Sequence, residues 1–187
     1  MIQMQTKRVP YTEPFLAAES GQLTVYVSDS PVHETAFRSA ADMVSDGDKL
    51  IVIDGAGCFH PLRMIQSARF GALDPTSLLK HIHIFQASSP GSLEQAILHE
   101  LEPAFDRFGT RRVLIPDPLH SLYDSQLSTR DAAQTLGRIK LKLESLATRG
   151  ADIAVLCHRK GGDLGTRAHF VLSLCAAADR VYFRNRT

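Results

Sequence analysis

The residues best suited to chemistry lie in one short stretch, Ile53-Asp54-Gly55-Ala56-Gly57-Cys58-Phe59-His60-Pro61-Leu62-Arg63-Met64. An apolar run ends in an acidic residue and a glycine-rich turn, and a segment with helical spacing follows. In an α/β fold this order places polar groups at the carboxyl end of a buried strand, where such folds bind ligands. Asp54 could act on a ligand there, or it could cap the glycine-rich turn.

Six short apolar runs recur along the chain and predict the strands that must carry these groups. They are continuous rather than alternating, which is typical of strands covered on both faces in a parallel sheet. The runs are Leu23 to Val27, Leu50 to Ile53, Ile82 to Phe85, Val113 to Ile115, Ile153 to Cys157 and Val181 to Phe183.

Helical patterns fill the intervals between these runs. The clearest apolar stripe consists of Ala132, Leu136, Ile139, Leu143 and Leu146, with Gly150 as the expected stop. Ser92 with Gln95 resembles a capping box for a helix that we expect to end at Pro103. The alternation predicts an α/β domain with a mainly parallel twisted sheet, helices on both faces and right-handed crossovers.

The composition limits the class of protein. At 187 residues the chain predicts one domain, over residues 22–187, behind an irregular arm of residues 1–21 that contains Pro10 and Pro14. The net charge of +1 does not indicate a nucleic-acid or membrane protein, and no apolar run approaches the ~20 residues of a membrane helix. Three widely spaced cysteines without a C-x-x-C pair predict reduced thiols and a cytoplasmic location.

Several segments, taken in order, resemble the RecA-type recombinases, most closely their archaeal and eukaryotic branch with its paralogues. Ile53 to Met64 resembles V-I-D-T-E-G-T-F-R-P-E-R-L, Phe70 to Pro75 resembles R-F-G-L-D-P, and His81 to Ile84 resembles N-I-H-V. Arg112 to Tyr123 resembles the Walker B strand, Gly150 to His158 resembles G-V-A-V-V-x-T-N-Q, and Asp179 to Arg184 resembles T-R-L-Y-L-R. The resemblance implies a RecA-like single domain without the family's N-terminal domain.

The chain departs from this family at the phosphate-binding loop. A P-loop reads G-x-x-x-x-G-K-[ST], but the stretch that follows the first apolar run is Ser28-Asp29-Ser30-Pro31-Val32-His33-Glu34-Thr35. His33 replaces the second glycine, Glu34 replaces the lysine, and Thr35 alone is kept. A carboxylate at the lysine position repels a phosphate by about 4 kcal/mol at ~4 Å before screening. Triphosphate binding in the usual mode is therefore not expected.

The resemblance also implies that the hydrolytic residues are lost. Ala56 stands where the recombinases have the glutamate that activates water, and an alanine cannot accept a proton. Cys157 and His158 replace the Asn-Gln pair that senses the γ-phosphate, whereas Asp117 survives at the Walker B position that helps to hold Mg²⁺. We therefore expect a pseudo-ATPase with no cofactor, no metal and a vestigial nucleotide site composed of His33, Glu34, Thr35, Asp54, Asp117 and His158.

The function implied is that of a non-catalytic RecA-like protein, an accessory or regulator in DNA repair, recombination or the damage response. It would contact a recombinase-like or repair protein, or another copy of itself. RecA-type proteins often pair a short strand of one subunit with the next, and the arm before Gly21, with Tyr11, Phe15 and Leu16, could do so.

Two alternatives remain open. The chain could be a single-stranded DNA-binding module that uses Arg130, Arg159, Lys160 and Arg167, although a plain solvated loop is the preferred explanation of the last three. It could instead bind an unusual nucleotide or another phosphorylated ligand in a remodelled pocket near His33, Asp54, Asp117 and His158. His81 and His83 would share one strand face, but the eight histidines show no zinc-binding spacing.

Overall fold

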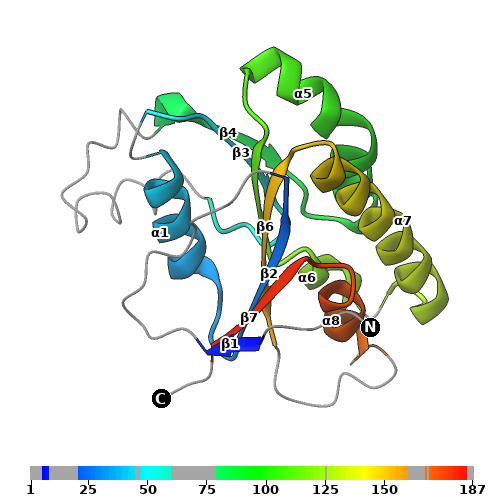
Figure 1. Cartoon of the computed structure of the whole chain (residues 1–187). Coiled ribbons are helices and arrows are strands. Elements are labelled where there is room, and N and C mark those ends of the chain that lie inside the picture. The colour runs from blue at the N-terminus through cyan, green and yellow to red at the C-terminus, as the bar shows by residue number, and fades with distance from the viewer. Residues whose placement is uncertain are drawn as a thin grey trace.

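The structure is a computed structural model that describes residues 6–8, 21–44, 47–59, 79–124, 126–159, 167 and 169–184. It is an α/β fold consistent with a RecA-like single domain (Figure 1). Each of the six apolar runs forms a strand, as the sequence predicts. The strands are β2 (Leu23–Ser28), β3 (Leu50–Asp54), β4 (Ile82–Gln86), β5 (Arg112–Pro116), β6 (Asp152–His158) and β7 (Arg180–Arg184).

These strands form one sheet with the order β1-β7-β2-β6-β5-β3-β4, in which β1 is Thr6–Arg8. Every pair of neighbours is parallel, so the expectation of a mainly parallel sheet is confirmed. The prediction of an irregular arm is wrong for Thr6–Arg8, which pairs with β7 at the edge of the sheet. The rest of the arm before Gly21 lies outside the described residues, as does the stretch from His60 to Met64.

The described helices lie on both faces of the sheet, as predicted. They are α1 (His33–Val44), α4 (Pro90–Gln95), the π-helix η1 (Ala96–Glu100), α5 (Leu101–Phe108), α6 (Leu119–Leu122), α7 (Thr129–Thr148) and α8 (His169–Cys175). Figure 1 shows α1 on one side of the sheet and α5, α7 and α8 on the other. No helix in the described part of the chain is long and apolar enough to cross a membrane.

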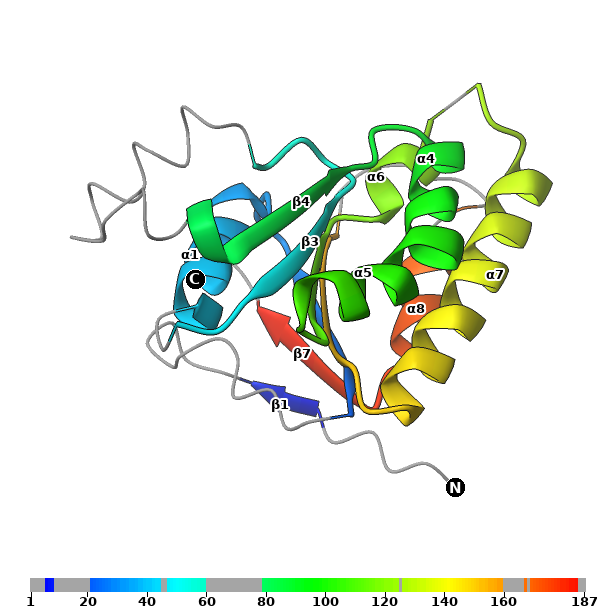
Figure 2. The same ribbon diagram turned by 90° about the horizontal axis from the view of Figure 1, so that it is seen from above.

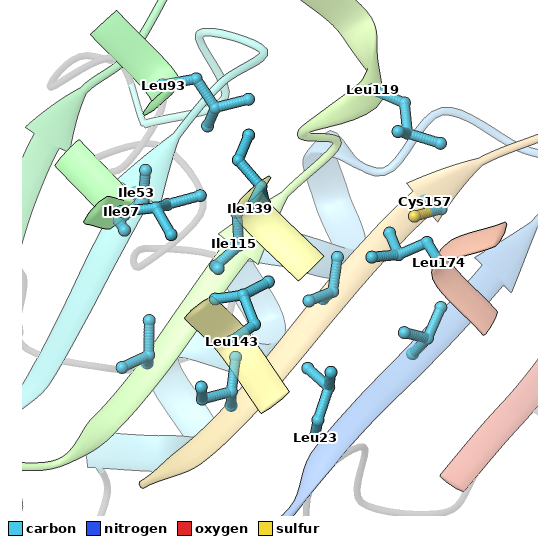
Figure 3. Close-up of a cluster of buried hydrophobic side chains, with 14 of the residues drawn as sticks. Leu23, Ile53, Leu93, Ile97, Ile115, Leu119, Ile139, Leu143, Cys157 and Leu174 are labelled. Atoms are coloured by element: carbon cyan, nitrogen blue, oxygen red, sulfur yellow. The ribbon is translucent and has the colours of Figure 1, made fainter. Parts of the chain in front are cut away.

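Alternate side chains of the strands divide between two buried clusters. Ile51 and Ile53 join the larger cluster under α4 to α8, whereas Leu50 and Val52 join the smaller cluster under α1. Figure 3 shows the larger cluster, in which side chains of β2, β3, β5 and β6 meet those of the helices. The apolar stripe predicted on α7 is buried here, and Gly150 follows that helix with a φ of 90° that suits glycine.

Two predictions about the helical segment before β5 are wrong. The N-cap is Ser89, whose hydroxyl accepts from the backbone N–H of Ser92, so the capping box pairs Ser89 with Ser92 rather than Ser92 with Gln95. The helical segment also continues past Pro103 to Phe108. Pro103 lies directly after the π-helix, where the helical hydrogen-bond pattern changes register.

Candidate functional site

The sequence-predicted residues gather at the carboxyl edge of the sheet. After β2 the chain turns to the face covered by α1, whereas after β5 and β6 it turns to the opposite face. Neighbouring strands whose connections leave to opposite faces create the crevice in which α/β folds bind ligands. This change of direction, the topological switch point, lies between β2 and β6, where Ser28 is the register partner of His158.

The two loops at this switch point are joined by an ion pair. The Arg159 Nε donates to the Asp29 Oδ1 at 2.7 Å, and the Arg159 backbone N–H donates to the Ser28 carbonyl oxygen at 2.8 Å. The Asp29 side chain is 27% exposed and the Arg159 side chain 57% exposed. The positive charge of Arg159 and the negative charge of Asp29 therefore neutralise each other at the switch point between β2 and β6.

The stretch that aligns with a P-loop is anchored to the protein core. Val32 is 3% exposed and belongs to the cluster under α1, and its carbonyl oxygen accepts from the Ala36 N–H at 2.7 Å. The Ser30 N–H donates to the Ser28 hydroxyl at 3.1 Å. These contacts tie part of the loop to the chain itself, whereas a P-loop directs its N–H groups at phosphate.

The first turn of α1 carries the three residues at the end of this stretch. His33, Glu34 and Thr35 open the helix, and the side chain of Glu34 is outside the described atoms. The His33 side chain is half-buried, and its Nδ1 atom is buried without a hydrogen-bond partner in the described part of the chain.

Asp54 caps the glycine-rich turn. The residue is fully buried, its Oδ1 accepts from the Cys58 N–H at 2.8 Å, and its Oδ2 accepts from the Phe59 N–H at 2.9 Å. Gln86 lies beside it, with Nε2 at 3.4 Å from Oδ2. Gly57 has a φ of 67°, a backbone conformation that suits glycine, so the geometry of the turn explains the glycine at this position. The structure thus bears out the capping interpretation of Asp54 with two direct hydrogen bonds.

Asp117 has an unusual backbone at the end of β5. Its φ of 42° lies in the left-handed region, where residues other than glycine are uncommon. Its N–H donates to the Leu156 carbonyl oxygen at 2.6 Å, and its Oδ1 accepts a long hydrogen bond of 3.4 Å from the His158 N–H. The side chain is 6% exposed, with His120 Nδ1 at 4.0 Å from Oδ2. The structure therefore brings Asp117 and His158 together.

Ala56 has a methyl side chain that packs against its neighbours. Its side chain is partly buried against the cluster under α1. Gly55 beside it approaches the β5 end closely, because a Cβ atom built there would lie 3.4 Å from the Asp117 carbonyl oxygen. The turn therefore lies directly against the end of β5.

The nearby cysteine is not activated. Burial raises the pKa of the Cys157 thiol well above its usual value, and the negative charge of Asp117 raises it further. A thiolate is the reactive form of cysteine, so this side chain is a buried apolar group rather than a nucleophile. Cys58 and Cys175 are buried and reduced as well.

Two of the four cations proposed for DNA binding, Arg159 and Arg167, have partners in the described part of the chain. The Arg167 guanidinium donates to the backbone carbonyl oxygens of Leu122 at 2.9 Å, of Asp124 at 2.6 Å and of Leu127. Arg130 is exposed in the first turn of α7, and Lys160 lies outside the described residues. Arg159 is paired with Asp29, so Arg167 and Arg159 both have partners within the chain.

The described histidines do not form a metal centre. His81 lies in a helical turn before β4, so the prediction that His81 and His83 share a strand face is wrong. His83 instead stacks on Phe108, with ring centroids 3.8 Å apart. Among the described residues, no three His, Cys, Asp or Glu side chains are placed to hold a metal ion.

Sequence reasoning missed the contact between Asp29 and Arg159. Each follows the last residue of its strand, but they are 130 residues apart in the chain. Only the pairing of β2 with β6 places them together. In the comparisons with known proteins, no protein-family model and no curated protein matches the chain.

Proposed function

We propose that this chain is a non-catalytic RecA-like protein that works by contact, as an accessory or regulator in DNA repair, recombination or the damage response. The observation that carries the proposal is the ion pair of Asp29 with Arg159 at the switch point between β2 and β6. The crevice that would receive a nucleotide is bridged by the chain's own charges. A ligand phosphate there would have to displace Asp29 from Arg159 while lying close to the Asp29 carboxylate.

The remaining acids support the same proposal. Asp54 uses both carboxylate oxygens on backbone N–H groups of its own turn, and Asp117 is buried at a strand end. Glu34 lies in the first turn of α1 at the position of the P-loop lysine, and Ala56 is partly buried at the position of the general base, so we infer that both functions are lost. A domain that keeps its core without this chemistry must act through its surface.

The partner we propose is a recombinase-like or repair protein, or a second copy of this chain, in the cytoplasm. This part of the proposal rests on the family resemblance, and function transfers poorly from fold alone. It therefore needs a test of its own.

Isothermal titration calorimetry of the full chain with Mg-ATP tests the loss of nucleotide binding. We expect no saturable heat at micromolar concentrations, because the charges that would bind the phosphates are absent or paired. A micromolar dissociation constant, equivalent to about 8 kcal/mol of binding free energy, would overturn the proposal. Circular dichroism of the same sample verifies that the domain is folded.

Affinity capture from the native host, followed by reconstitution with the purified partner, tests the contact function. We expect a recombinase or a repair protein to bind directly, or light scattering to show self-association. Capture of neither, together with a monomeric mass at all concentrations, would contradict the proposal.

One observation favours a second candidate, a binder of a phosphorylated ligand. The buried Nδ1 of His33 lacks a partner in the described part of the chain, at the amino end of α1 where anions are favoured. Titration with phosphorylated nucleosides would reveal such a ligand by saturable binding that His33→Ala weakens.

A further inference from the structure

A group of cations near the amino end of β4 has no acidic partner in the described part of the chain. Elsewhere, ion pairs with carboxylates are formed by Arg112, Arg138, Lys142, Arg149 and Arg159. Lys49, Lys80 and Arg107 are exposed, and none of their side chains forms an ion pair or a hydrogen bond with a described residue. Together with the half-buried His83 we call them the basic corner.

The pairing of β3 with β4 brings part of the basic corner together. Leu50 is the register partner of Ile82. Lys49 directly precedes Leu50, and Lys80 and His81 directly precede Ile82. Figure 2 shows β4 as the last strand of the sheet on this side, next to β3. The two lysines therefore lie at the amino ends of neighbouring strands, at one corner of the sheet.

Arg107 and His83 meet at the ring of Phe108, the last residue of α5. His83 stacks on this ring with centroids 3.8 Å apart and planes inclined by 10°, and the guanidinium carbon of Arg107 lies 5.1 Å from the ring centroid. Phe85 contacts the same ring edge-on, with centroids 6.4 Å apart, and packs against the larger buried cluster. The stack therefore holds the imidazole and the guanidinium beside one aromatic ring.

The surroundings of His83 are positively charged. Burial lowers the pKa of His83 from its usual 6.5, and Lys49, Arg107 and His81 lower it further. Asp48 lies next to Lys49 in the chain but pairs with Arg112 at 2.6 Å. The Nε2 atom of His83 is buried and has no hydrogen-bond partner among the described residues. The acid nearest to Lys49 therefore does not offset the positive potential at His83.

The helix dipole accounts for one of these cations. Arg107 lies in the last turn of α5, where the partial negative charge of the helix end favours a cation. Lys49 and Lys80 are not on that helix, and like charges at one corner repel each other. An anion bound among them would remove this repulsion and would favour the charged form of His83.

We propose that the basic corner is a binding site for a phosphate group. Such a group carries about two negative charges near neutral pH and offers several strong acceptor oxygens. The planar guanidinium of Arg107 suits two of these oxygens, and the lysines supply point charges. An inorganic phosphate ion and the backbone of a nucleic acid share this chemistry. The basic corner lies at the amino edge of the sheet, away from the switch point at the carboxyl edge, so the inference does not depend on the proposed function.

Nuclear magnetic resonance of the His83 ring in the full chain tests the proposal. Inorganic phosphate, added at pH 7 and at an ionic strength kept constant with sodium chloride, should shift the ring resonances saturably. His99, an exposed histidine of η1, should not respond. If only a single-stranded oligonucleotide produces the saturable shift, the phosphate group is that of a nucleic acid. No saturable shift of His83 with either probe, or an equal shift of His99, would overturn the proposal.

Matched variants test which cations bind the phosphate group. Lys49→Ala and Arg107→Ala should each weaken the binding of the effective probe about fivefold, because each removes one exposed ionic contact. Arg38→Ala, at an exposed cation of α1 on the other face of the sheet, should keep the affinity of the parent. Circular dichroism verifies that all three variants are folded. Affinities of Lys49→Ala and Arg107→Ala equal to that of Arg38→Ala would overturn the proposal.

Discussion

Asp29 and Arg159 form an ion pair of 2.7 Å across the carboxyl ends of β2 and β6. The pair lies at the point where the chain leaves neighbouring strands for opposite faces of the sheet, which is the usual ligand position of this architecture. Two charged side chains at this position are thus engaged with each other.

Breaking this pair should cost little stability, because both side chains are in contact with water. For Arg159→Ala or Asp29→Asn we expect a loss of about 0.2–1 kcal/mol in the free energy of unfolding by urea, and less at high salt. The double variant should lose hardly more than either single one. Arg130→Ala, at an exposed cation of α7, serves as the control. Fully additive losses would mean that the pair does not form in solution.

Asp54→Ala should destabilise the domain strongly. The change leaves the buried N–H groups of Cys58 and Phe59 without their acceptors, at a cost of about 1–3 kcal/mol each. Asp54→Asn keeps one acceptor oxygen and should cost less. Asp106→Ala, at an exposed residue of α5, should stay close to the parent. Chemical denaturation measures all three, and an Asp54→Ala variant as stable as the control would contradict the capping role.

Glu102 should make stability depend on acid pH. Hydrogen bonds from Arg149 and then Lys142 lower the pKa of this carboxyl from its usual 4.5 to about 2. Between these values the unfolded chain binds more protons than the folded one, so stability falls as pH falls through that window. Urea midpoints from pH 6 to pH 2 should fall less steeply for Glu102→Gln than for the parent. The control is Glu100→Gln, and an identical slope in both variants would contradict the linkage.

Arg167→Ala should loosen the segment between α6 and α7. The guanidinium donates to the carbonyl oxygens of Leu122, Asp124 and Leu127. A hydrogen bond that involves a charged group contributes up to about 1.5–3 kcal/mol to the free energy of unfolding. Hydrogen exchange of residues 122–127 should accelerate. Arg167→Lys should behave similarly, because an ammonium group cannot reproduce the planar fork.

Single-stranded oligonucleotide binding, measured on the same Arg167 variants, separates this structural role from a DNA contact. A DNA-contacting arginine predicts weaker binding and a shallower salt dependence without accelerated exchange. A structural role predicts accelerated exchange with unchanged oligonucleotide binding and an unchanged salt dependence.

The strands and the long helix α7 could be predicted from the sequence because their signals are local. Continuous apolar runs predict doubly covered strands, and the 3.6-residue period of Ala132 to Leu146 predicts a buried helix face. Gly150 was predictable as the helix stop for the same local reason. The capping box and Pro103 were predicted wrongly, because a serine one turn earlier and a π-helix changed where the helical turns begin.

By itself the sequence determined which segments are strands and which face of α7 is buried, since each depends on neighbouring residues alone. Only the tertiary structure decided the strand order, and with it the contacts of Asp29 with Arg159 and of Tyr26 with Tyr182. The physical reason is that similar apolar runs carry little information about which strand pairs with which, because burial is largely non-directional and the order depends on how all the helices pack at once.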